Sequence, residues 1–285
     1  MQTNELFKKI EAQGIKVKKS DILEHINKYG YYRIVSCYGK LLKEASKECK
    51  KHPNTQELLA LFEFDKNLAN MIASYLFDFE QQLNTISMDE IFKINNLHDD
   101  YVLTITNNPA FTHLRKKGLS SFNEDIYENA KSCNLIPQNI DVRSLPLKIL
   151  SLSWSFHTLI SFIFLQDDNV LENICTRFNI PNGLTNDFIS ACHSIRKFRN
   201  ILSHNGIFFS YTLSFYRREF NHLINICCQK QYHLDDDINI YKILILLEKI
   251  LNKDILKTDL KKIFKETKLP KHIKKYVLTK MGFSN

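Results

Sequence analysis

Apolar residues recur along most of this chain at intervals of three and four positions, which is the spacing of an amphipathic α-helix. The longest such pattern covers residues 52–86. Asn54 followed by Glu57 forms a capping-box pattern near its start. Asp65 falls inside the apolar stripe, which consists of Leu61, Leu68, Ile72, Tyr75, Phe79, Leu83 and Ile86. The pattern therefore predicts a long helix that carries one acidic residue on its apolar face.

Weaker helical patterns fill most of the remaining chain, and no internal repeat is visible. Further helices are predicted over residues 146–166, 185–203, 211–228 and 235–251. Only 7 glycines and 6 prolines are present, which leaves little material for β-turns. We predict an all-α fold. It would consist of an N-terminal helical extension (1–52), a helical core (53–232) and lysine-rich C-terminal helices (233–285).

Composition excludes several classes of protein. Charged residues at 25% and hydrophobic residues at 44% are typical of a soluble globular chain of 285 residues. The most hydrophobic stretch, residues 149–166, is interrupted by serines and His157, which favours a buried helix over a membrane span. The seven cysteines show no C-x-x-C spacing, and no secretory signal is evident, so we expect reduced thiols in the cytoplasm. No metal, cofactor or glycine-rich phosphate loop is predicted.

Positive charge is concentrated near the C-terminus. Residues 249–285 contain eleven lysines and three acidic residues, a net charge of +8 that equals the net charge of the whole chain. Lysines on a folded face contact phosphates without reading bases, which favours RNA as a partner, although a solubilising surface would look the same. The candidate RNA-binding residues are Lys257, Lys261, Lys262, Lys265, Lys268, Lys271, Lys274 and Lys275, with Arg115, Lys116 and Lys117 in a second basic stretch.

Candidate chemistry lies in the segment RNILSHNG, residues 199–206. On a helical wheel Arg199 falls within the apolar arc of its helix, where a cation needs an acidic partner or a cleft. Asp65 is the most natural partner and Glu80 the second choice. Asn200 and His204 of the segment lie on an adjoining face of the helix, with Arg196 nearby.

These residue types suit the cleavage of RNA without a metal ion. His204 titrates near neutrality and can transfer a proton to or from a ribose hydroxyl. Arg199 can bind a phosphate with two donors, and Asn200 can orient the histidine. Attack by the 2′-OH would leave a 2′,3′-cyclic phosphate. The spacing alone is not specific, since Arg217 and His222 also match it, and a buried salt bridge beside a helix-ending histidine is the alternative.

The same segment resembles the R-N-x-x-x-H signature of HEPN-type ribonucleases, and the wider chain resembles abortive-infection proteins of the AbiD/AbiF type. Three further pieces are similar to that family and occur in its order. They are the aromatic block YGYYRIVSCY (29–38), the acidic and apolar helix at 61–83, and the proline-led aromatic helix at 146–164. Cys37 departs from the family, which more often has a small glycine there.

The resemblance implies a HEPN-like helical core and a role in bacterial anti-phage defence. It implies that Arg199 and His204 are the catalytic pair, with Asn200 as their support. Asp65, Glu80 and Arg196 are the candidate supporting residues from their positions in the sequence. It also implies a homodimer and an association with a structured RNA. Two alternatives stay open, namely a non-catalytic RNA-binding module of the same fold and a HEPN toxin controlled by a protein antitoxin.

Overall fold

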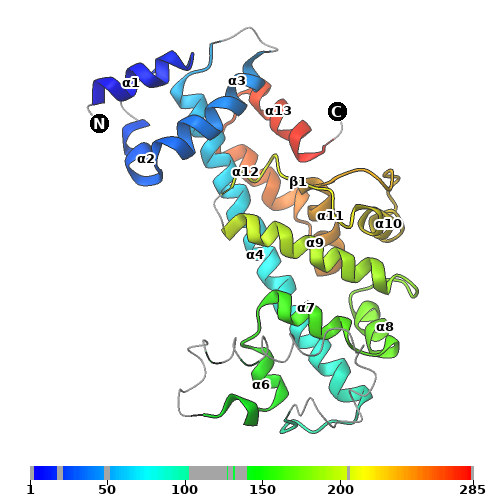
Figure 1. The fold of residues 1–285 in the computed structure, drawn as a ribbon. Helices are drawn as coiled ribbons and strands as arrows, with labels where there is room; N and C mark the ends of the chain where they lie inside the picture. The colour runs from blue at the N-terminus through cyan, green and yellow to red at the C-terminus, as the bar shows by residue number, and fades with distance from the viewer. Residues whose placement is uncertain are drawn as a thin grey trace.

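The computed structural model describes residues 3–17, 22–47, 52–102, 127, 131, 140–203 and 206–283. The predicted all-α class is confirmed (Figure 1). Within the described residues, the regular β-structure is one short antiparallel pair, β1 (Thr212–Leu213) with β2 (Ile238–Asn239). None of the described helices is both long enough and apolar enough to cross a bilayer.

Helix α4 (Thr55–Ile94) is the central element of the fold. Its 40 residues span about 60 Å. The predicted capping box is confirmed: the Asn54 side chain accepts from the Glu57 backbone N–H, and the Glu57 carboxylate accepts from the Asn54 N–H, each at 3.1 Å. The helix continues eight residues past the predicted end at residue 86, because Met88, Ile91 and other apolar residues there remain buried.

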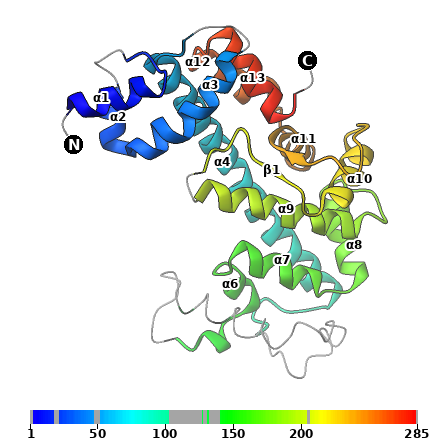
Figure 2. The ribbon, with the colours of Figure 1, turned by 45° about the horizontal axis from the view of Figure 1, so that its top comes forward.

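The N-terminal and C-terminal segments pack together at the first half of α4 (Figures 1 and 2). Tyr276 donates a hydrogen bond to Glu44 at 2.7 Å, and the Phe64 and Phe264 rings lie 4.7 Å apart. The N-terminal elements are α1 (Thr3–Ala12), α2 (Ile22–Tyr29), the π-helix η1 (Tyr32–Tyr38) and α3 (Gly39–Lys47). The C-terminal elements are η4 (Leu256–Leu260), α12 (Lys261–Glu266) and α13 (Lys271–Met281).

At the other end of α4 lie η3 (Val142–Ser144), α6 (Leu147–Ser151), α7 (Phe156–Phe164) and α8 (Asp168–Arg177). The prediction of one helix over 146–166 is wrong, because α6 and α7 are separate. Ser155 begins α7 by accepting a hydrogen bond from the Thr158 backbone N–H at 3.1 Å. The backbone of Ser155 is extended, with φ −68° and ψ 156°, so a continuous helix cannot pass through it.

Helix α9 (Thr185–Ser203) crosses α4 and packs against α4, α7, α8 and α10 (Figure 2). Its bounds agree with the sequence prediction. Helices α10 (Arg217–Cys227) and α11 (Ile240–Leu251) begin later than predicted, since β1 and β2 occupy residues ahead of them. Asn239, and not the acidic run before it, caps α11 by accepting from the Lys242 N–H at 3.1 Å.

Candidate functional site

The last turns of α9 carry the candidate site. Phe188, Ile195 and Phe198 of α9 are buried in the core, and the Phe188 ring lies 6.5 Å from Phe79 of α4. This packing fixes the helix that presents Arg199 and Asn200. His204 lies outside the described residues, as do the predicted RNA contacts Arg115, Lys116 and Lys117.

Arg199 pairs with α4, but not at the residue that was expected. Its Nε lies 3.9 Å from Oε2 of Glu80, and the arginine side chain is 48% exposed. The predicted pairing with Asp65 is therefore wrong, and the second choice is the observed partner. Asp65 and Glu80 are fifteen residues apart, or about 22 Å along α4. The predicted burial is also wrong, since the long side chain carries its charge out of the apolar arc to the surface.

Glu80 provides a partly buried carboxylate beside this cation. Burial raises its pKa, and the opposing effect of Arg199 is smaller. The Glu80 side chain is 21% exposed, so the pair lies at the edge of the core and is only partly screened by water. A carboxylate at this distance limits where the guanidinium can point.

Asp65 holds the chain segment that follows the signature. Its side chain is buried and accepts the backbone N–H of Phe208 at 3.0 Å and that of Phe209 at 2.7 Å. It also accepts the hydroxyl of Tyr38 at 2.6 Å. Burial raises the pKa of Asp65, while the three donors favour the ionised carboxylate. The aromatic block, the central helix and the segment after the signature are thus joined through one buried carboxylate, a role that the sequence pattern did not predict.

A second group of polar residues lies on α9 before Asn200. The His193 ring stacks on Tyr216, with the ring centroids 5.5 Å apart and an interplanar angle of 20°. Burial, followed by the charges of Arg196, His157 and nearby Lys197, lowers the pKa of His193 to about 4. Nδ1 of His193 and Nε of Arg196 are buried without a hydrogen-bond partner among the described residues. His193 is therefore a neutral ring next to cations.

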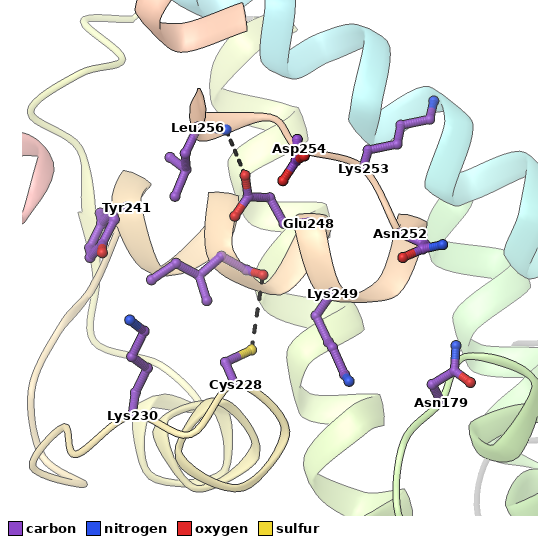
Figure 3. A pocket seen from close by; sticks show the side chains of 11 residues that line it. Asn179, Cys228, Lys230, Tyr241, Glu248, Lys249, Asn252, Lys253, Asp254 and Leu256 are labelled. Carbon is purple, nitrogen blue, oxygen red and sulfur yellow. Dashed lines mark hydrogen bonds between the residues drawn. The ribbon is translucent and has the colours of Figure 1, made fainter. Parts of the chain in front are cut away.

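Two hollows open on the surface of the described chain, and the first of them adjoins the site. One, of about 730 Å³, is formed by α4, α6, α7 and the turn between the last two, and Glu80 lines it. The other, of about 500 Å³, lies beside α11 and is lined by three lysines, Lys230, Lys249 and Lys253 (Figure 3). There the Glu248 carboxylate accepts the Leu256 backbone N–H at 2.6 Å. No described residue of the signature lines the second hollow.

The eight C-terminal lysines predicted to bind RNA are all exposed, on or beside η4, α12 and α13. Lys262 lies 3.9 Å from Glu266, and Lys274 covers the ring of Phe264 at 5.0 Å from its centroid. Among the described residues, no group of three or more His, Cys, Asp or Glu side chains is placed to hold a metal ion. We refer to these exposed lysines together as the C-terminal basic face.

Comparison with protein families places these features in context. The model of the Abi-like protein family matches residues 24–210, about two thirds of the chain. The match includes the aromatic block, α4 and the signature segment. The chain belongs to the Abi-like protein family. Comparisons with curated proteins and with solved structures each gave no match. Membership of the Abi-like family supports a role in abortive-infection defence.

Proposed function

We propose that this Abi-like protein is a metal-independent endoribonuclease of the HEPN type and of the AbiD/AbiF subtype. The observation that carries the proposal is the geometry of Arg199. It is an exposed arginine at the end of a core helix, 3.9 Å from a partly buried carboxylate. The following segment is anchored by Asp65. A cation held in this way is suited to binding a phosphodiester, because its orientation is set before the substrate arrives.

Arg199 and His204 have separate roles in the proposed reaction. Arg199 binds the scissile phosphate and stabilises the negative charge that develops on it, while Glu80 orients the guanidinium. The ribose 2′-OH loses its proton and attacks the adjacent phosphorus, and the bond from phosphorus to the 5′ oxygen breaks. The leaving oxygen takes a proton, and His204 is the residue proposed to transfer protons. The products are a 2′,3′-cyclic phosphate and a 5′-hydroxyl.

The proposal extends to assembly and control. Helix α9 carries one signature arginine, Arg199. A composite HEPN site uses two such helices, so we propose a homodimer. The C-terminal basic face is proposed to bind a structured RNA that controls the enzyme, since its lysines are exposed to solvent. Binding of this kind is strongly salt dependent, which gives the assignment a direct test.

The decisive experiment is cleavage of end-labelled total bacterial RNA in EDTA, after bound nucleic acid has been removed with high salt. Wild type is compared with Arg199→Ala and His204→Ala. Arg217→Ala is the matched control, because Arg217 and His222 share the spacing but Arg217 lies 3.5 Å from Asp237. Cleavage by wild type and the control alone, with cyclic phosphate ends, is expected. Equal cleavage by all four proteins would contradict the assignment.

A non-catalytic RNA-binding role is the second candidate, and the exposed C-terminal basic face favours it. Under this alternative the wild type binds RNA in a salt-dependent manner but cuts none, and Arg199→Ala binds equally well. The cleavage experiment therefore separates the two functions.

A further inference from the structure

The hollow formed by α4, α6 and α7 adjoins the Arg199–Glu80 pair. Its volume of about 730 Å³ falls within the range of small-ligand sites. Helix α4 lines it with residues three and four positions apart, from Phe77 through Glu80 and Asn84 to Met88. Glu80 belongs both to this hollow and to the ion pair with Arg199. A ligand in the hollow would therefore lie next to any phosphate bound at Arg199.

The lining combines flat apolar surface with unused hydrogen-bonding groups. Phe77 is 59% exposed, although large aromatic side chains are usually covered. Gln81 makes no side-chain hydrogen bond to any described residue. Asn84 donates to the Ser151 carbonyl at 3.0 Å, which leaves its own side-chain oxygen to accept another bond. Exposed rings with nearby amides are the combination that binds an unstacked base.

We propose that this hollow is a nucleobase subsite, which holds one unpaired base of the RNA next to the phosphate at Arg199. The inference deepens the proposed ribonuclease function and rests on it. Phe77 stacks on the base, and the amides of Gln81 and Asn84 contact its polar edge. Lys148 is not a phosphate contact in this arrangement, because its Nζ already lies 2.7 Å from Asp99. Gln81 is the specificity-determining residue.

The chain contains a built-in reporter of occupancy. Trp154 is its one tryptophan, and this residue lines the hollow with 8% of its surface exposed. Stripped wild-type protein is titrated in EDTA with each of the four nucleoside 5′-monophosphates, and Trp154 emission is recorded. Ribose 5-phosphate is the base-free control. The expected result is saturable quenching by nucleotides and none by ribose 5-phosphate.

Phe77 and Gln81 are both exposed, so substitutions there should preserve the fold, and circular dichroism checks that they do. Phe77→Ala should raise the nucleotide Kd by about fivefold or more, since fivefold is the smallest effect expected from the loss of one base–aromatic stack. Gln81→Leu should change the ranking of the four nucleotides. Phe215→Ala is the matched control, because Phe215 is 70% exposed but does not line the hollow, and its Kd should equal that of wild type.

The outcomes separate the subsite from the proposed catalysis. RNA cleavage by wild type without nucleotide quenching, and with an unchanged cleavage pattern in Phe77→Ala, would overturn the subsite and leave the ribonuclease intact. Quenching that depends on Phe77, in a protein that cuts no RNA, would support base binding and overturn the ribonuclease. Should Phe77→Ala instead dissociate a dimer while nucleotides give no quenching, the hollow is covered by a second copy of the chain and the subsite is refuted.

Discussion

Replacing Asp65 with asparagine tests the most heavily bonded polar group in the described core. The carboxylate accepts three donors at 3.0 Å or less, from Tyr38, Phe208 and Phe209. An asparagine side chain at this position would keep one acceptor oxygen and place an NH₂ group against at least one of those donors. A hydrogen bond to a charged group contributes about 1.5–3 kcal/mol, and a buried unsatisfied donor costs about 1–3 kcal/mol. Asp65→Asn should therefore destabilise the protein by about 3–5 kcal/mol.

The assay is urea unfolding followed by circular dichroism, with the free energies extrapolated to water. Tyr38→Phe removes one donor and leaves the others, so we expect a loss of about 1–2 kcal/mol. Since both residues share one bond, the double variant should lose less than the sum of the two single losses. Glu80→Gln is the matched control on the same helix, and its half-exposed ion pair should contribute less than about 1 kcal/mol. An Asp65→Asn protein within about 0.5 kcal/mol of wild type would refute the reasoning, since that is the spread expected of surface substitutions.

Three other results are expected. The pKa of His193 is lowered to about 4, so below pH 6.5 the unfolded chain binds more protons than the folded one, and stability should fall from pH 6.5 towards pH 4. The urea midpoint should fall less over this range in His193→Gln than in wild type. Equal falls in the two proteins would contradict the lowered pKa. Glu80→Gln should reduce RNA cleavage several-fold with a nearly unchanged unfolding midpoint. Arg199→Lys should be almost as inactive as Arg199→Ala, because lysine lacks the two-donor fork of the guanidinium. Full activity of Arg199→Lys would refute bidentate binding of the phosphate. Changing Lys268 and Lys271 together to glutamine should lower the slope of log K against log salt for single-stranded RNA by about 1.4, and an unchanged slope would place the RNA elsewhere.

Sequence patterns predicted the helices that carry the site. The capping box at Asn54 and the apolar stripe located α4, and the helical pattern over residues 185–203 located α9. These features are local, because a cap and a helical face are determined by residues within a few positions of one another. The break between α6 and α7 was missed because Ser155 is one of several serines in this hydrophobic stretch, and its capping role depends on its geometry.

The partner of Arg199 could not be predicted for a different reason. Helical periodicity identifies the face of α4 that is buried, but several turns of a 40-residue helix present acids near that face. Which turn meets the end of α9 is decided by long-range packing, such as that of Phe188 on Phe79. The buried position of Asp65 was visible in the sequence. Two of the donors to its carboxylate are backbone N–H groups, however, and these carry no sequence signal.

The bonds to Asp65 also constrain the order in which the chain can be assembled. Tyr38 and Asp65 are separated by 27 residues, whereas Phe208 is 143 residues beyond Asp65. During synthesis the N-terminal pair can therefore form long before the amides of Phe208 and Phe209 leave the ribosome. Contacts of such long range form slowly, so the segment after Arg199 is among the last to be fixed. A nascent chain would thus lack the completed end of its proposed phosphate-binding site until more than two thirds of it has been made.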